Sequence, residues 1–321
     1  MSGKSPLLVA MEMSSIRSID RLTSGMGGRD VVFVKDRPDE EIFHDVKYAL
    51  VWKPDAKLFS RLPDLEVIFS VGAGVDHIFA CDDVPDVPIV RFVDPDLTTR
   101  MSEWICLQAL SHLRQAPAYS RFQREHRWHE LSQPQASEIT IGIMGMGELG
   151  SDAAAKLSTL GFRVIGWSRS GKSSREVAGV EMFNTHRLEA FLRQTNMLIG
   201  LLPLTEDTIG IFNRKVFSML ERHEEIASPV FINAGRGGSQ SEADIVSCLR
   251  DGTLGGVSLD VFEEEPLDAD SLLWDFDNAI LTPHAAAVSD MANMARHVSA
   301  QISRYEAGEP LQFLVDRNRG Y

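Results

Sequence analysis

A glycine-rich turn between two apolar segments has the residue types and spacing that bind phosphate groups. The apolar run Ile139–Met144 leads into Gly145, Gly147 and Gly150 in the pattern G-x-G-x-x-G, and a helical pattern then extends to Leu160. The first glycine permits a sharp bend, the second lets backbone approach a pyrophosphate, and the third lets helix and strand pack closely. A helix N-terminus also attracts phosphate through its N–H groups and its dipole. We predict a dinucleotide site rather than a structural glycine turn, with contacts from Gly145, Met146, Gly147, Glu148, Leu149 and Gly150.

The end of the next apolar run, Phe162–Trp167, indicates which dinucleotide binds. NAD-binding units usually place Asp or Glu about 20 residues after the glycines, where the carboxylate holds the ribose hydroxyls. This chain has Trp167, Ser168, Arg169 and Ser170 at that place. Arg169 can pair with a ribose 2′-phosphate, and both serines can donate hydrogen bonds to it. We predict NADP(H) as the preferred cofactor and NAD(H) as the alternative; an arginine that is only solvated, or that stacks on adenine, would select neither.

Four further loops follow predicted strands and carry polar or charged side chains. They are L-L-P-L-T at 201–205, N-A-G-R-G-G at 233–238, L-D-V-F-E-E-E-P at 259–266 and L-T-P-H-A-A at 281–286. Ligands of parallel α/β sheets bind at the carboxyl ends of the strands. An arginine, Arg236, a run of carboxylates and a histidine, His284, are therefore expected to converge on one rim. Each alone also fits a surface or structural role, but their occurrence at successive strand ends favours an active site.

Composition limits the classes of protein that the chain can belong to. Its 321 residues are enough for two domains. The 46 acidic and 32 basic side chains give a net charge of −14, which disfavours nonspecific binding to nucleic acid or anionic membranes. We find no signal peptide and no apolar run of membrane-spanning length. The widely spaced Cys81, Cys106 and Cys248 suggest free thiols in a reducing cytoplasm, and no Cys or His cluster suggests a metal.

The strand pattern predicts two α/β domains. Strand-like runs at 7–11, 31–34, 48–52, 66–71 and 89–93 precede the glycine turn, and runs at 197–201, 230–233, 257–260 and 279–281 follow it. We expect a doubly wound parallel-sheet Rossmann domain, residues 104–287, inserted into a smaller flavodoxin-like α/β substrate-binding domain, residues 1–103 and 288–321. Long helices at 103–119 and 290–307 would connect the domains, and a substrate would bind in the cleft between them.

The sequence resembles the NAD(P)-dependent D-isomer-specific 2-hydroxyacid dehydrogenases along nearly its whole length. The shared motifs are V-G-A-G-V-D at 71–76, G-M-G-E-L-G at 145–150, N-A-G-R-G at 233–237, D-V-F-x-x-E-P at 260–266 and P-H at 283–284. Within this family it looks most similar to the bacterial glyoxylate/hydroxypyruvate reductase A group. That likeness rests on A-L-V-W-K-P at 49–54, G-W-S-R-S at 166–170 and V-D-R-N-R-G-Y at 315–321, whereas residues 96–102 match the family poorly.

The resemblance implies catalytic roles for Arg236, Glu265 and His284. Arg236 would bind the carboxylate and the carbonyl oxygen of a 2-oxoacid, because a planar guanidinium suits two acceptors and stabilises developing negative charge. His284 would protonate the carbonyl oxygen as hydride arrives and act as the base in reverse, since histidine titrates near neutral pH. Glu265 would hold the other imidazole nitrogen. We choose it over Glu263 and Glu264 because the family glutamate directly precedes the proline, here Pro266.

The resemblance also implies binding contacts. Glycine-rich backbone should bind the substrate carboxylate through N–H groups, at Val71, Gly72, Ala73 and Gly74. Trp52 and Met101 would wall the pocket, although both also fit an ordinary core. Further cofactor contacts would come from Leu202, Pro203, Thr208, Ala234, Gly235, Asp260 and Ala286, with a helix cap as the alternative for Asp260. Trp128, in the polar arm 121–137, would lie on a dimer arm, which implies a homodimer.

The implied activity is NADPH-dependent reduction of glyoxylate to glycolate and of hydroxypyruvate to D-glycerate. One alternative is a dehydrogenase for a bulkier 2-hydroxy acid. A formate dehydrogenase is disfavoured because such enzymes carry glutamine at the place of Glu265. Another alternative is a non-catalytic NAD(P)-sensing interaction protein, although the long partner-binding segments of such proteins have no counterpart here. The expected partners are therefore a small 2-oxoacid or 2-hydroxyacid and a second copy of the chain.

Overall fold

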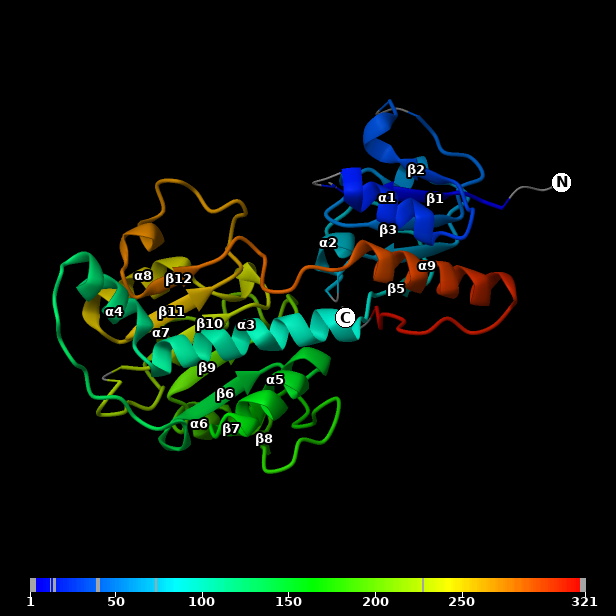
Figure 1. Cartoon of the computed structure of the whole chain (residues 1–321). Helices are drawn as coiled ribbons and strands as arrows, with labels where there is room; N and C mark the ends of the chain where they lie inside the picture. The colour runs from blue at the N-terminus through cyan, green and yellow to red at the C-terminus, as the bar shows by residue number, and fades with distance from the viewer. Residues whose placement is uncertain are drawn as a thin grey trace. The chain divides into compact units, whose positions relative to one another are not determined.

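The computed structural model describes residues 4–11, 13, 16–38, 41–72, 74–226 and 228–317. The chain divides into two compact units, one formed by Met1–Leu97 with Ser289–Tyr321 and the other by Thr98–Val288. In Figure 1 the blue and red ends of the chain belong to the first unit, and the green to orange middle belongs to the second. The limits expected from sequence, at 103/104 and 287/288, lie six residues and one residue from these divisions.

A parallel five-stranded sheet forms the centre of the first unit. Its strands follow the order β2-β1-β3-β4-β5, and every neighbouring pair is parallel. The strands are β1 (Leu7–Ala10), β2 (Val31–Phe33), β3 (Tyr48–Val51), β4 (Val67–Ser70) and β5 (Ile89–Val90). This order is the flavodoxin-like one, so the structure confirms the predicted fold of this unit. Strands β1, β3 and β4 are buried throughout, as expected for a parallel sheet that is covered on both faces.

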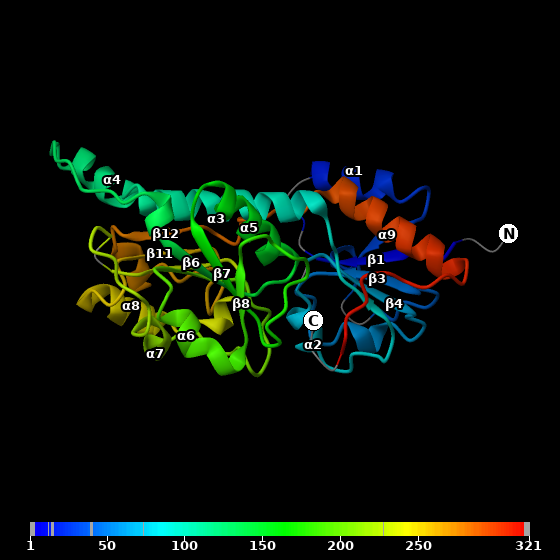
Figure 2. The ribbon, with the colours of Figure 1, turned by 90° about the horizontal axis from the view of Figure 1, so that it is seen from below.

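The helices of the first unit are α1 (Ile16–Gly25), α2 (Asp76–Phe79) and α9 (Met291–Glu306). Helices α1 and α9 lie against each other on one face of the sheet (Figure 2). Their approach is close, because a Cβ built at Gly25 would lie 2.4 Å from the Cβ of Ala295. Helix α9 begins after Asp290, whose carboxylate accepts hydrogen bonds from the backbone N–H groups of Ala292 and Asn293.

A parallel seven-stranded sheet forms the centre of the second unit. Its order is β12-β11-β10-β9-β6-β7-β8, and every neighbouring pair is parallel. The strands are β6 (Thr140–Met144), β7 (Arg163–Trp167), β8 (Glu181–Phe183), β9 (Met197–Gly200), β10 (Val230–Asn233), β11 (Gly256–Leu259) and β12 (Ala279–Leu281). The strand order reverses between β6 and β9, which is the switch point of a doubly wound sheet. The predicted Rossmann fold is therefore confirmed, and β8 is an edge strand that the sequence pattern did not predict.

Helices cover both faces of this sheet. The described helices of this unit are α3 (Pro95–Leu113), α4 (Ala116–Arg124), α5 (Glu148–Thr159), α6 (Leu188–Leu192), α7 (Arg214–Phe217) and α8 (Glu242–Asp251). Figure 2 shows α3 and α5 on one face of the seven-stranded sheet, and α6, α7 and α8 on the other. The single helix predicted over 103–119 is wrong at both ends, because α3 begins at Pro95 and the left-handed Gln115 (φ +52°) separates it from α4.

Side chains that alternate along each strand build a separate core on each face. Ile141, Ile143 and Ile232 pack with the helices α3 and α5 in one cluster. Leu198 and Phe231 face the other way and pack with α7 and α8 in a second cluster. The strands are therefore held from both sides, and their carboxyl ends form a rigid base for the loops that follow. None of the described helices is long and apolar enough to cross a membrane.

Candidate active site

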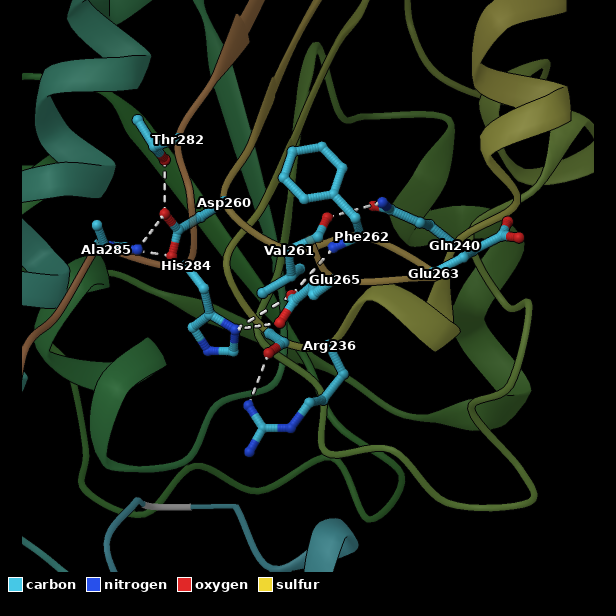
Figure 3. Close-up of polar contacts among 12 residues, drawn as sticks. Arg236, Gln240, Asp260, Val261, Phe262, Glu263, Glu265, Thr282, His284 and Ala285 are labelled. Atoms are coloured by element: carbon cyan, nitrogen blue, oxygen red, sulfur yellow. Dashed lines mark hydrogen bonds and ion pairs between the residues drawn. The ribbon is translucent and has the colours of Figure 1, made fainter. Parts of the chain in front are cut away.

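A histidine and a glutamate form a close pair in the loops that follow β11 and β12. The Nδ1 atom of His284 lies 2.9 Å from one carboxylate oxygen of Glu265 and 3.1 Å from the other. Because an ionised carboxylate only accepts hydrogen bonds, the Nδ1–H group donates to it. The side chain of His284 is 34% exposed and that of Glu265 is 19% exposed, so the imidazole remains accessible while its partner is mostly covered. Figure 3 shows the pair and the groups around it.

The backbone of His284 is held in a conformation that non-glycine residues seldom adopt. Its φ is +51°, in the left-handed region, where a side chain costs about 1–2 kcal/mol. Asp260, 2% exposed, holds the loop in place: its carboxylate accepts hydrogen bonds from the N–H groups of Ala285 (2.8 Å) and Ala286 (3.0 Å) and from the hydroxyl of Thr282. The N–H of His284 donates to the carbonyl of Asp260 at 2.8 Å. Asp260 therefore orients the histidine loop.

Arg236 lies three residues beyond the end of β10, in a loop that is built around Asn233. The side-chain oxygen of Asn233 accepts the N–H of Gly235 at 3.0 Å, and its amide nitrogen donates to the carbonyl of Arg236 at 3.3 Å. The half-buried Arg236 turns one guanidinium nitrogen back toward the carbonyl of Gly235, at 2.9 Å. In Figure 3 the side chains of Arg236, Glu265 and His284 extend into the same region. Their loops thus bring together the three residues predicted to carry the chemistry.

The glycine turn has the backbone geometry that its spacing predicts. Gly145 has φ +113°, and a Cβ there would lie 2.4 Å from the carbonyl oxygen of Leu201. A Cβ at Gly150 would lie 2.0 Å from the carbonyl oxygen of Gly145, so the helix packs directly on the turn. At Gly147 no heavy atom of the described residues lies within 4 Å of a built Cβ, and α5 begins at the next residue. A helix N-terminus therefore faces open space, as a pyrophosphate site requires.

The residues predicted to recognise the ribose end form a tight turn after β7. Arg169 lies 2.9 Å from the carboxylate of Asp207, and both side chains are more than half exposed. The hydroxyl of Ser168 donates to the carbonyl of Lys172 and accepts its N–H, so it holds the turn 168–172. Ser170 is exposed, whereas Trp167 is buried with its indole N–H donating to the carbonyl of Asn184. The strand end thus presents Arg169 outward, and the hydroxyl of Ser168 already stabilises the turn.

A segment that follows this turn is attached to the glycine turn. The N–H of Ser174 donates to the carbonyl of Met146 at 2.8 Å, and Arg175 pairs with Asp152 at 2.6 Å. Partial burial raises the pKa of Asp152, but hydrogen bonds from Lys156, Ser102 and Arg175 outweigh it and lower the value to about 2. The ionised carboxylate of Asp152 therefore ties α3, α5 and this segment together beside the predicted pyrophosphate site.

The other predicted cofactor residues lie after the ends of β6, β9, β10 and β12. Most are buried in this unit, namely Met146, Leu202, Thr208, Ala234, Gly235 and Ala286. Glu148 is exposed at the start of α5, and Leu149 and Pro203 are half-buried. The hydroxyl of Thr208 donates to the carbonyl of Pro203 at 2.7 Å and accepts the N–H of Thr205, so it shapes the loop after β9.

The predicted substrate residues divide between the two units. Met101 is 7% exposed and packs in the core beside α5, within the second unit. Trp52, Val71, Gly72 and Gly74 belong to the first unit, and Ala73 lies outside the described residues. There the ring of Trp52 packs so closely on Gly72 that a Cβ at this glycine would lie 2.6 Å from it. Trp52 therefore lies directly against the V-G-A-G loop.

Comparison with known proteins identifies the family. Residues 106–286 match the model for the NAD-binding domain of the D-isomer specific 2-hydroxyacid dehydrogenases. The glyoxylate/hydroxypyruvate reductase A of Escherichia fergusonii is 39% identical over 286 residues, which cover 87% of this chain and 89% of that protein. The chain belongs to the D-isomer specific 2-hydroxyacid dehydrogenase family. The resemblance seen in the sequence is therefore confirmed.

Solved structures of dehydrogenases in this family share the whole fold. An NADPH-dependent glyoxylate/hydroxypyruvate reductase from Sinorhizobium meliloti, in complex with NADP and sulfate, is 51% identical with a TM-score of 0.92, and covers 99% of this chain and 100% of its own. A probable 2-hydroxyacid dehydrogenase from Rhizobium etli, in complex with NADP, HEPES and L(+)-tartaric acid, is 51% identical with a TM-score of 0.90, and covers 98% and 99%.

Sequence reasoning missed several residues that support the site of this dehydrogenase. Asp207 pairs with Arg169 from 38 residues away, and no sequence pattern relates the two. Asn233 and Gln240 flank the arginine loop and are fully buried. A polar residue at the end of an otherwise apolar strand was the available signal for Asn233, because buried amides need partners. Gln240 lies two residues after the glycine pair at 237–238, and only the folded loops show which groups its side chain contacts.

Proposed function

We propose that this protein reduces small 2-oxoacids with NADPH, converting glyoxylate to glycolate and hydroxypyruvate to D-glycerate. The observation that carries the proposal is the His284–Glu265 pair, 2.9 Å apart, at the same carboxyl-terminal edge of the sheet as Arg236. An anion-binding cation, a proton donor and a carboxylate partner are what reduction of a charged carbonyl compound needs. Two relatives of similar length are named as glyoxylate/hydroxypyruvate reductases, which supports the same choice of substrate.

The glycine turn and the end of β7 fit a bound NADP(H). We assign the pyrophosphate to the N-terminus of α5, where a Cβ built at Gly147 would meet no heavy atom of the described residues within 4 Å. We assign the 2′-phosphate to Arg169, with Ser170 beside it, because a guanidinium pairs well with a dianion. NAD(H) remains the secondary cofactor. When bound, NADPH supplies the hydride that reduces the carbonyl carbon.

The chain's own groups bind and orient the substrate and move the proton. Arg236 binds the substrate carboxylate and carbonyl oxygen, and its charge stabilises the negative charge that develops on that oxygen. His284 donates a proton from Nε2 to the same oxygen, because Nδ1–H is directed to Glu265. Glu265 keeps the ring oriented and compensates the positive charge of the protonated imidazole. In the oxidative direction His284 accepts the proton.

We further propose that the V-G-A-G loop provides N–H groups for the substrate carboxylate. Residues Val71 to Gly74 would contribute backbone, and the glycines would let it come close. Trp52, packed on Gly72, would limit the size of the group attached to the carbonyl carbon, as would Met101. This size limit favours two- and three-carbon oxoacids over a dehydrogenase reaction with a bulkier acid.

Replacement of Arg236 tests the proposed reaction. With NADPH and glyoxylate or hydroxypyruvate, the wild type should consume NADPH, and Arg236→Ala should lower kcat/KM by about 10²-fold or more. Arg250→Ala removes an exposed arginine of α8 in the same unit and should change kcat/KM by less than twofold. Normal kinetics for Arg236→Ala would refute its role. If the wild type binds NADPH but reduces none of a panel of 2-oxoacids, the result would favour a non-catalytic NAD(P)-sensing protein over a reductase.

We also propose that the protein is a cytoplasmic homodimer. Trp128 lies beyond α4 and is a fully exposed residue. Such an aromatic side chain suits a protein interface. Cys81, Cys106 and Cys248 are free thiols, which a reducing compartment maintains. In sedimentation experiments, Trp128→Ala should shift the dimer toward monomer, whereas Trp274→Ala, at another exposed tryptophan, should not; a monomeric wild type would contradict the proposal.

A further inference from the structure

The loop that carries Arg236 and the loop that carries Glu265 are joined by one buried carboxamide, that of Gln240. Gln240 is 2% exposed and lies four residues after Arg236, beyond the 3-10 helix Gly237–Ser239. Its side-chain oxygen accepts the amide N–H of Asn233 at 2.8 Å, and its side-chain nitrogen donates to the carbonyl of Val261 at 2.9 Å. Figure 3 shows the bond to Val261 beside the catalytic pair. Both ends of the carboxamide are therefore engaged, one in each loop.

On the arginine side, this bond fixes the residue that shapes the loop. Asn233 also donates to the carbonyl of Arg236 at 3.3 Å, so Gln240 orients the amide that holds the backbone of the arginine. The backbone of Gln240 is fixed in turn by a β-bridge to Phe212, within the core. The arginine loop is thereby anchored at its first residue and at its last.

On the glutamate side, the bond fixes the segment just before Glu265. Val261 precedes Phe262, whose N–H donates to the Glu265 carboxylate at 3.3 Å. The carbonyl of Phe262 also presses on the arginine loop, since a Cβ at Gly237 would lie 1.7 Å from it. The two loops are therefore in direct backbone contact, and the Gln240 carboxamide bridges them with two hydrogen bonds.

We propose that Gln240 is a positioning residue that sets the placement of the Arg236 guanidinium relative to the Glu265–His284 pair. Only a carboxamide of this length presents an acceptor to Asn233 and a donor to Val261 at once. A side chain of similar length without these groups would leave a buried N–H and a buried carbonyl unpaired, and the loops would move to satisfy them. Displacements of about 1 Å at a reacting centre can lower rates about 10²-fold.

The test compares Gln240→Met with wild type and with Gln301→Met. Gln301 is an equally buried glutamine, 3% exposed, on α9 of the other unit, where it bonds to Gln312. For glyoxylate with NADPH, Q240M should lower kcat about 10- to 100-fold, leave the Kd for NADPH within threefold, and raise the isotope effect on kcat with NADPH deuterated at the transferred position. Q301M should lose about as much thermal stability as Q240M and keep its kcat within twofold of the wild-type value.

The inference rests on the proposed function, and the outcomes separate the two. An inactive wild type would refute the proposed function. An active wild type together with a folded Q240M whose kcat and isotope effect are unchanged would refute the role of Gln240. If Q240M does not fold, Q240E replaces it, because it keeps the shape of the side chain but, when ionised, cannot donate to Val261. A Q240E with the kcat of the wild type would also overturn the role.

Discussion

The imidazole Nδ1 of His284 lies within hydrogen-bonding distance of both carboxylate oxygens of Glu265, at 2.9 and 3.1 Å. The pair fixes the tautomer, because the carboxylate can only accept and Nδ1 must carry the proton that it donates. The opposite ring nitrogen, Nε2, is then the one that exchanges a proton with substrate in the proposed reaction. The two residues come from different loops, so the pair exists only when the ends of β11 and β12 are correctly placed.

Replacing Glu265 by glutamine should slow the reaction without weakening cofactor binding. A glutamine has nearly the same shape, but it lacks the charge that stabilises a protonated imidazole. We expect Glu265→Gln to lower kcat about 10²-fold, within the range that general acid–base catalysis contributes. Glu264→Gln removes an exposed carboxylate one residue away and should have less than a twofold effect. Steady-state kinetics and NADPH titrations of both variants provide the measurement. A kcat for Glu265→Gln equal to that of the wild type would contradict the role of Glu265 in catalysis.

Asp260 should matter for both stability and turnover. Its carboxylate accepts three hydrogen bonds from residues 282–286, which hold His284 at φ +51°. In Asp260→Asn one oxygen becomes an NH₂ group that cannot accept the N–H of Ala285 or Ala286. We expect a loss of about 2 kcal/mol in unfolding free energy and a lower kcat. Asp270→Asn, at an exposed position, should change neither, as urea unfolding and kinetics would show; an unaffected kcat in Asp260→Asn would contradict its orienting role.

The pair of Arg169 with Asp207 predicts opposite effects of two substitutions on cofactor use. Arg169→Ala should weaken the binding of NADPH about 10- to 100-fold and leave the binding of NADH nearly unchanged, because only NADPH carries the 2′-phosphate. Asp207→Asn should strengthen the binding of NADPH severalfold, since Asp207 competes with the 2′-phosphate for the guanidinium of Arg169. Arg187→Ala breaks a comparable exposed pair with Glu181 and serves as the control. Fluorescence titrations with both cofactors provide the measurement, and equal losses for NADPH and NADH in Arg169→Ala would rule out the assigned role.

A buried histidine should make stability depend on pH. His112 lies on α3, and its Nε2 is 2.9 Å from the Ser258 hydroxyl, which donates to the side-chain oxygen of Gln108. Because the serine hydroxyl proton is directed to Gln108, the Nε2–H group of His112 is the donor in the bond to Ser258. Burial lowers the pKa of His112 from its ordinary value near 6.5 to about 4.

The sign of the effect follows from proton binding. Between pH 6.5 and 4 the unfolded chain binds a proton at His112 that the folded chain does not, so folding stability falls as pH falls through this window. The contribution of neutral His112 to the free energy of unfolding is fully present above pH 6.5, and about 3 kcal/mol of it is lost by pH 4. Urea midpoints across this range should fall less steeply in His112→Gln than in wild type. His44→Gln, at an exposed histidine, should follow the wild type, and identical slopes for all three proteins would contradict the assignment.

The sequence predicted the strands far better than the contacts between loops. The strands β10 and β12 match their predicted limits, because each is a short apolar run; β10 is buried throughout, whereas β12 is a partly buried edge strand. The edge strand β8 has only three residues and was missed. Arg236 and His284 were found because they follow strand ends, and Glu265 was chosen from the run 263–265 because the family glutamate directly precedes the proline. Asp207 and Gln240 were not, since Asp207 pairs with Arg169 from 38 residues away and Gln240 joins two different loops, which only the folded chain brings together.

Substitution of His284 tests the central claim most directly. Asparagine tolerates the left-handed backbone of this position, so His284→Asn should preserve the loop while removing the proton donor. In single-turnover experiments with NADPH and hydroxypyruvate, the wild type should oxidise the bound cofactor, and His284→Asn should bind NADPH equally well but react about 10²–10⁴-fold more slowly. A variant that oxidises NADPH within a few-fold of the wild-type rate would contradict the account.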